Sequence, residues 1–156
     1  MKASVYLESS VISYLTARPS RDIVSAARQA ITEEWWMSCR SRFEIFISVL
    51  VEVEISSGDP SAAQRRLNAV RDVLRLGVLP EAETVANALI TAKAVPQNSK
   101  EDALHIGIAV ANGIEYVLTW NFKHINNAEK KSAIVEVVEE LGYLCPILCS
   151  PEELGA

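Results

Sequence analysis

The chain has 156 residues, of which 49% are hydrophobic, 22% charged and 6% aromatic, and its formal net charge is −5. This length suits one domain over 1–156 with a sizeable core, and the composition excludes a disordered tail, a collagen and a small disulfide scaffold. The acidic balance also argues against a protein that coats DNA regardless of sequence, because such a protein carries a basic stripe.

The first part of the chain is predicted to alternate between strands and helices. We expect a strand over 3–7, a helical stretch beginning over 11–15, a helix from Ser20 through Trp36, a strand over 43–47 and an apolar helix over 49–56. Ser20 and Ser48 are predicted to cap the helices that follow them, because a serine hydroxyl accepts a hydrogen bond from an amide of the first helical turn.

The same alternation continues to the end of the chain. The expected segments are a helix from Pro60 through Leu74, helices over 81–95 and from Ser99 to Asn112-Gly113, a strand over 115–119, a helix over 128–141 closed by Gly142, and a last strand over 143–148. Pro146 favours an edge position for this last strand. Strands separated by helices predict the α/β class, with a short, mostly parallel sheet flanked by helices on both faces.

Neither a membrane span nor a secretion signal is expected. The longest uncharged apolar run, Ile45 to Val51, is far shorter than the ~20 residues that cross a bilayer, and Glu8 interrupts the apolar start. An odd count of three cysteines predicts reduced thiols in a cytoplasm. Cys145 and Cys149 lack a second pair of zinc ligands and are interpreted as core residues.

Oxygen-bearing side chains follow three of the predicted strands, at the edge where α/β proteins bind ligands. They are Glu8, Ser9 and Ser10 after the first strand, Ser48 with Glu52 and Glu54 after the second, and Asn121 after the third. Asp102 adds a carboxylate in the first turn of an otherwise apolar helix. Carboxylates gathered at one edge repel one another when nothing is bound, and such oxygen donors are the ligands that Mg²⁺ and Mn²⁺ prefer.

Each of these residues also has a purely structural interpretation. Glu8 suits a solvated turn, Asn121 suits a turn, and Ser99-x-x-Asp102 has the spacing of a capping box. His105, one turn after Asp102, is more often a packed, hydrogen-bonded group than a ligand. One of Glu52 and Glu54 is expected to face inward, and helical position alone does not say which.

Four motifs resemble the PIN-domain family, and within it the VapC-like toxins of type II toxin–antitoxin systems. The opening VYLESSVISYL resembles an Asp-Thr-Ser-Val-Ile start, and in ISVLVEVEI the six-residue count from Ser48 selects Glu54. EDALHIGIAVANGIEYVLTWN resembles an Asp-Ala-Leu-His-Ile helix followed by a Thr-Trp-Asn strand end, so that Asp102 and Asn121 take the third and fourth positions. The closing CSPEEL resembles a Thr-Pro-Glu-Glu-Leu ending.

This resemblance implies a metal-dependent ribonuclease, with a cytoplasmic location, an antitoxin partner and a homodimer. Glu8, Glu54 and Asp102 would hold Mg²⁺ or Mn²⁺ for hydrolysis of an RNA phosphodiester bond, with Asn121 completing the catalytic set. Ser10 and Thr119 would orient the ligands or their waters.

Two positions depart from the family pattern. Glu8 replaces the usual aspartate, and its extra methylene moves the carboxylate by about 1.5 Å, while Asn121 replaces an acid present in many members. The alternative is therefore a catalytically weakened PIN-fold module that acts by binding protein or RNA. A metal-dependent phosphatase or phospho-acceptor domain ranks below both, because it needs an aspartate where this chain has Glu8.

Overall fold

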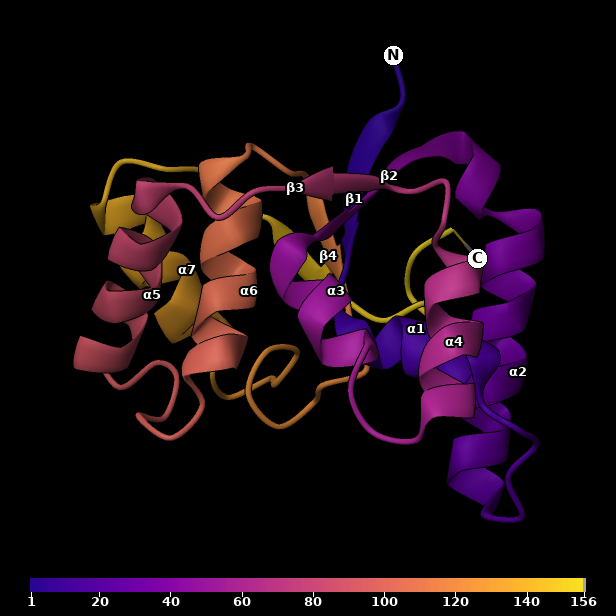
Figure 1. Ribbon diagram of the computed structural model, residues 1–156. Coiled ribbons are helices and arrows are strands. Elements are labelled where there is room, and N and C mark those ends of the chain that lie inside the picture. Colours follow the sequence, from indigo (N-terminus) through magenta and orange to yellow (C-terminus); the bar gives the residue numbers. More distant parts are fainter. Residues whose placement is uncertain (156) are drawn as a thin grey trace.

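The computed structural model describes residues 1–155 and is built on one five-stranded sheet (Figure 1). Its strands are β1 (Ala3–Leu7), β2 (Phe43–Ser48), β3 (Leu74–Leu76), β4 (Tyr116–Leu118) and β5 (Ile147–Cys149), in the spatial order β3-β2-β1-β4-β5. Each neighbouring pair is parallel. The carboxyl ends of β1, β2 and β4 therefore meet at one edge, as the sequence predicted.

Helices lie on both sides of this sheet, which confirms the predicted α/β class. They are α1 (Ser9–Thr16), α2 (Ile23–Ser38), α3 (Val49–Ile55), α4 (Pro60–Ala69), α5 (Pro80–Thr91), α6 (Lys100–Ala111) and α7 (Lys131–Glu140), with a 3₁₀ turn at Arg40–Arg42. In Figure 1, α5, α6 and α7 gather to the left of β1, while α1, α2 and α4 lie to its right. No helix within residues 1–155 is both long and apolar enough to span a bilayer.

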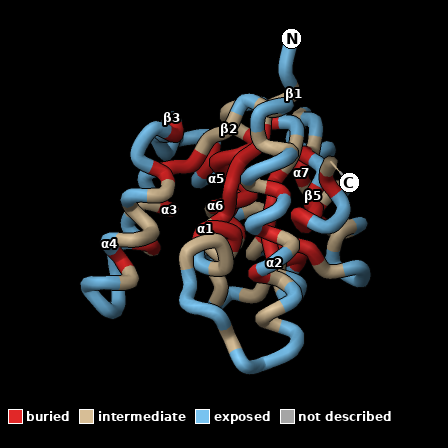
Figure 2. The backbone as a smooth tube through the Cα atoms, turned by 90° about the vertical axis from the view of Figure 1, so that its right-hand side faces the viewer, coloured by how far each residue is buried: buried red, intermediate tan, exposed pale blue. Residues whose placement is uncertain are grey.

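The core is centred on β1. Val5, Tyr6 and Leu7 are fully buried, and Figure 2 shows buried segments running through the middle of the molecule. On α6, Gly107 faces α5 so closely that a Cβ atom there would strike the carbonyl oxygen of Ala82. A side chain of any size at this position would therefore force the two helices apart.

Two predicted helix limits are wrong. Asp22, not Ser20, caps α2: its Oδ2 accepts a hydrogen bond from the amide of Ser25 at 2.9 Å, and the Ser20 hydroxyl accepts the amide of Asp22 instead. The helix from Pro60 ends at Ala69, and Leu74 starts the edge strand β3 opposite Phe46. The apolar spacing that suggested a longer helix also suits a short helix followed by an edge strand.

Of the other predicted helix caps and ends, three are confirmed and one, the capping box at Ser99, is not. Ser48 caps α3, with its hydroxyl 3.2 Å from the amide of Val51, and Gly113 and Gly142 have positive φ after α6 and α7. Ser99, by contrast, makes no side-chain hydrogen bond to α6, so the capping box with Asp102 does not form. The last helix is confirmed with shorter limits, and the last strand begins four residues later than predicted and ends one residue later, at Cys149.

Candidate metal centre

Glu8 lies at the junction of β1 and α1, and its carboxylate is buried, with 6% of the residue exposed. Its Oε1 accepts hydrogen bonds from the hydroxyls of Ser10 at 2.5 Å and Thr119 at 2.6 Å, and its Oε2 accepts the Ser10 amide at 3.1 Å. The last bond makes Glu8 the side-chain cap of α1. Because β4 lies beside β1, its end brings Thr119 to this carboxylate. Glu8 is therefore not the solvated turn residue of the structural alternative.

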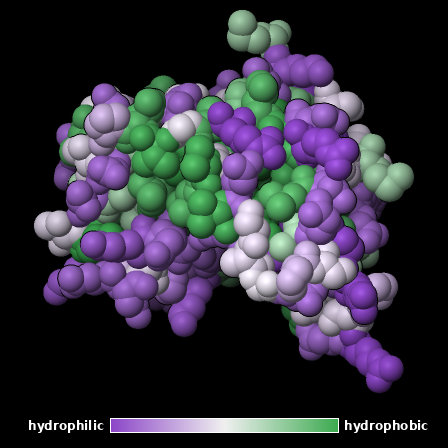
Figure 3. Space-filling view, viewed as in Figure 1, coloured by the Kyte–Doolittle hydropathy of each residue, from purple (hydrophilic) through white to green (hydrophobic). Residues whose placement is uncertain are grey.

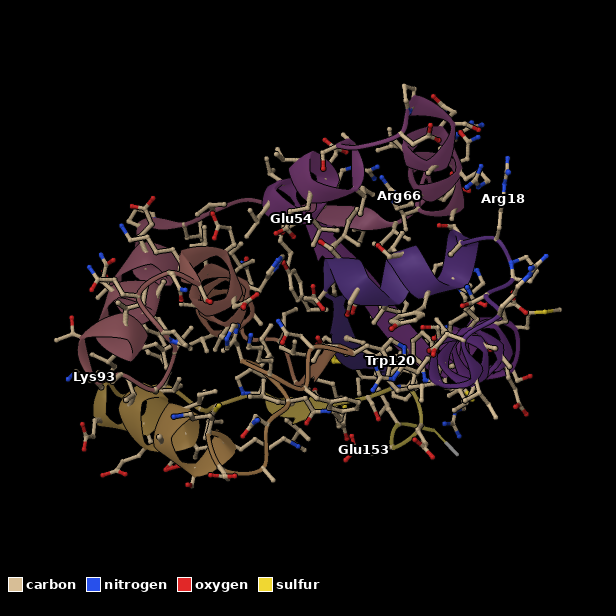
Figure 4. All side chains as sticks on the ribbon, turned by 90° about the horizontal axis from the view of Figure 1, so that it is seen from below. Arg18, Glu54, Arg66, Lys93, Trp120 and Glu153 are labelled. Carbon is tan, nitrogen blue, oxygen red and sulfur yellow. The ribbon has the colours of Figure 1, made fainter. Side chains whose placement is uncertain are left out.

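Glu54 is the inward-facing glutamate of α3. Its Oε1 accepts hydrogen bonds from the Ser9 hydroxyl at 2.5 Å and from Nε2 of His105 at 2.7 Å. Figure 4 looks onto this edge from below and shows Glu54 on α3, beside the space between α6 and α1. Glu52 points away and pairs with Arg75. The six-residue count from Ser48 thus selected the glutamate that faces the cluster.

The electrostatic setting keeps Glu54 ionised at neutral pH. Burial raises the pKa of its carboxyl, but the His105 ring and the Ser9 hydroxyl outweigh burial, and the pKa lies below its ordinary value. A buried carboxylate that stays charged needs such donors, or a cation.

Glu8, Glu54 and His105 form the one group of potential metal ligands found within residues 1–155, each offering an atom within 4.8 Å of the others. Oε2 of Glu54 accepts no hydrogen bond from the described residues, and Oε2 of Glu8 accepts only the Ser10 amide. Two carboxylates, each with an oxygen that can take a further ligand, suit Mg²⁺ or Mn²⁺. The donor set therefore fits the ions that the sequence predicted.

Asp102 does not join this group. Its Oδ2 lies 2.7 Å from Nδ1 of His124, in the segment after β4, and both side chains are about one-fifth exposed, at 21% and 20%. Asp102 and His105 are on the same helix, three residues apart, so Asp102 still lies one turn from the cluster.

Asn121 uses its side chain in a turn. Its Oδ1 accepts the amides of Lys123 at 3.2 Å and His124 at 3.0 Å, while its own amide donates to the Thr119 hydroxyl at 2.9 Å. The structure thus brings Ser10 and Thr119 directly to Glu8, and Asn121 to the same strand end.

Sequence reasoning missed three contacts around the candidate site. It did not single out Tyr6 or His124, and it named Ser48 as a helix cap without its contact with Tyr6. The Tyr6 hydroxyl lies 2.7 Å from both the Ser48 hydroxyl and Nδ1 of His105. A tyrosine inside a fully buried strand was the available signal, because its hydroxyl needs a partner there.

Three similar solved structures are distant from this chain in sequence. VapBC2 from Rickettsia felis, solved with a DNA fragment from its promoter, has 13% identity and a TM-score of 0.55, and the match covers 94% of this chain and 98% of that one. VapC20 from Mycobacterium tuberculosis, described as a toxin that cleaves the sarcin–ricin loop, has 16% identity and a TM-score of 0.59 over 80% and 95% of the two chains. VapBC-1 from nontypeable Haemophilus influenzae has 11% identity and a TM-score of 0.59 over 96% and 99%.

At these identities the three structures establish the fold alone. The chain matches no curated protein sequence. A family model described as the PIN domain matches residues 5–130, which include Glu8, Glu54, Asp102 and Asn121. The resemblance based on the sequence motifs is thereby confirmed, and the chain belongs to the PIN-domain family.

Proposed function

We propose that this PIN domain is a metal-dependent endoribonuclease of the VapC-like toxin type. The observation that carries the proposal is the convergence of Glu8 and Glu54, from the ends of β1 and β2, on one cluster whose potential ligand atoms lie within 4.8 Å of one another. Opposed carboxylates of this kind are costly without a cation. The sarcin–ricin-loop cleavage stated for VapC20 adds support from the fold.

Glu8 and Glu54 would hold Mg²⁺ or Mn²⁺, with Asp102 as a further acidic group one turn away. A bound ion of this kind supplies a water of lowered pKa and stabilises charge on the phosphate. The Ser10 and Thr119 hydroxyls fix the Glu8 carboxylate, and Asn121 holds the turn that carries His124 beside Asp102. The residues of the protein thus hold charged oxygens in place for the ion that would act on an RNA phosphodiester.

The test is a time course of cleavage of a fluorescent unstructured RNA with Mn²⁺ or Mg²⁺. We expect cleavage by the parent, none in EDTA and none by Glu54→Gln. Glu52→Gln is the matched control, because Glu52 is two residues away on α3 and pairs with Arg75 outside the cluster. Cleavage that survives Glu54→Gln, or no cleavage with any divalent ion, would contradict the proposal.

A catalytically weakened module that binds RNA or protein is the second candidate. The hydrogen bonds to Glu8 favour it, because three of them already engage that carboxylate and leave only its Oε2 able to take a further ligand. Binding of the fluorescent RNA by the parent without Mn²⁺-dependent cleavage would select this candidate.

We also propose an antitoxin partner, self-association as a homodimer and a cytoplasmic setting. The similar VapBC structures support the antitoxin, and the free thiols of all three cysteines suit a cytoplasm. Apolar side chains gather over α3 and around β3 on the face drawn in Figure 3. The exposed ones in these elements and the loop after β3 are Val49, Val53, Leu74, Val78 and Leu79. Light scattering of the purified chain tests the dimer, and co-purification with the product of the neighbouring reading frame tests the antitoxin.

A further inference from the structure

Both ring nitrogens of His105 are engaged in the buried interior. Nε2 lies 2.7 Å from Oε1 of Glu54, and Nδ1 lies 2.7 Å from the Tyr6 hydroxyl. The side chain of His105 is 1% exposed. A nitrogen that binds a metal must present a lone pair to it, so the use of Nε2 decides what His105 does.

The protons in this network can be placed one by one. The ionised Glu54 carboxylate only accepts, so Nε2 of His105 carries the proton between them. With the proton on Nε2, Nδ1 accepts from the Tyr6 hydroxyl, and burial raises the pKa of that hydroxyl, which keeps it a donor. The Ser48 hydroxyl donates to the Tyr6 oxygen and itself accepts the Val51 amide at 3.2 Å. Every hydrogen bond in the network then has one donor and one acceptor.

The network also connects the position of α3 to the orientation of its glutamate. Ser48 caps α3 through Val51, and Glu54 lies one turn further along the same helix. Ser9 and His105 both donate to Oε1 of Glu54, while Oε2 accepts nothing from the described residues. The two donors therefore fix one carboxylate oxygen and leave the other open.

We propose that His105 is a positioning residue and not a metal ligand: Tyr6 and Ser48 hold its Nε2–H on Oε1 of Glu54, which directs Oε2 toward the ion. This inference rests on the proposed function, because it concerns the metal that Glu54 would bind. It makes Tyr6, at the centre of the sheet, a determinant of metal affinity without contact to the metal.

The tautomer of His105 is the first measurement. The chain has two histidines, so a long-range ¹H–¹⁵N spectrum of the metal-free protein resolves both, and His124→Gln assigns them. We expect His105 as the Nε2–H tautomer, unchanged on saturation with diamagnetic Mg²⁺. A switch to Nδ1–H with Mg²⁺ would show that Nε2 binds the ion and would overturn the proposal.

The affinity for Mn²⁺ is the second measurement, made by calorimetry on folded variants. Tyr6→Phe removes the donor to Nδ1 and should weaken Mn²⁺ binding by about 10- to 100-fold, as loss of outer hydrogen bonds does at other metal sites. His105→Gln keeps an N–H near the Nε2 position and should bind Mn²⁺ more tightly than His105→Leu. Tyr143→Phe, a half-buried tyrosine outside this network, is the matched control.

The outcomes separate this inference from the proposed function. Unchanged Mn²⁺ affinity in both Tyr6→Phe and His105→Leu, with the parent binding Mn²⁺, would overturn the positioning role alone. A parent that binds no Mn²⁺ would overturn both. If Tyr6→Phe fails to fold, the order of His105→Gln and His105→Leu gives the same decision.

Discussion

Asp102 on α6 and His124 in the segment after β4 are in hydrogen-bonding contact, with Oδ2 of Asp102 2.7 Å from Nδ1 of His124. A site made of acids alone predicts that Asp102→Asn relieves repulsion and leaves the metal-free protein as stable or more stable. With His124 as its neighbour, we expect Asp102→Asn to lower the free energy of unfolding by about 1 kcal/mol. Chemical denaturation in EDTA measures this.

A second variant separates the structural role of Asp102 from metal binding. His124→Gln should lower the free energy of unfolding in EDTA by a similar amount. The double mutant should lose less free energy of unfolding than the sum of the two single mutants. If Asp102 also binds the ion, millimolar Mn²⁺ should raise Tm less in Asp102→Asn than in His124→Gln. Equal rises in Tm for the two variants would show that Asp102 does not bind the ion and contributes only its contact with His124.

The Glu8 carboxylate accepts hydrogen bonds on both oxygens, from Ser10 and Thr119 on Oε1 and from the Ser10 amide on Oε2. The resemblance to the family implies an aspartate at this position, so that the longer Glu8 side chain suggests an overfilled site, in which Glu8→Asp would raise cleavage. These hydrogen bonds lead us to expect the opposite, because retracting the carboxylate by about 1.5 Å takes it away from Thr119. Glu8→Asp should therefore slow Mn²⁺-dependent RNA cleavage, and Glu8→Gln should abolish it while the fold persists. Faster cleavage by Glu8→Asp would support the overfilled site.

Glu153 stabilises the turn after β5 in a pH-dependent way. Burial raises the pKa of its carboxyl, but hydrogen bonds from Ser150 and Asn126, with the charge of Lys131, outweigh burial and hold the pKa below its ordinary value. A lowered pKa in the folded state means that this stabilisation is present above the ordinary glutamate pKa and disappears as the pH falls through the folded value.

Glu153→Gln should therefore lower the free energy of unfolding by about 0.5 kcal/mol at pH 7, a small effect because the group is exposed. The difference from the parent should vanish as the pH falls through the pKa of the folded Glu153 carboxyl. Glu152→Gln is the matched control, since Glu152 is adjacent and exposed. Urea unfolding at several pH values measures both variants, and a loss that is independent of pH would contradict the role of the charge.

The crossing of α5 and α6 depends on Gly107. Alanine normally stabilises a helix relative to glycine by about 1 kcal/mol. Here a Cβ atom would strike the Ala82 carbonyl, so Gly107→Ala should cost about 1–3 kcal/mol net. Gly77→Ala has open space around its Cβ and should be close to neutral. Comparison of the two Tm values is the measurement, and equal values would contradict the close approach.

The sequence by itself determined the class of fold and the family. Apolar segments between serine and glycine signals indicated strands alternating with helices, because side-chain periodicity and capping are local properties. The same local reasoning identified Ser48 as a cap and Gly113 and Gly142 as helix ends, while the resemblance to the family motif selected Glu54 over Glu52. Local reasoning failed for Leu74, where one apolar pattern suits both a helix and an edge strand.

Only the tertiary structure decided how the polar residues are partnered. Thr119 reaches Glu8 because β4 lies beside β1, although 111 residues separate them. The contacts of His105 with Tyr6 and Glu54 span 99 and 51 residues. Hydrogen bonds between distant residues depend on strand order and helix packing, and a single sequence carries no local signal of either. For that reason the sequence named the acids at this edge, while the fold determined that Asp102 pairs with His124 and that His105 holds Glu54.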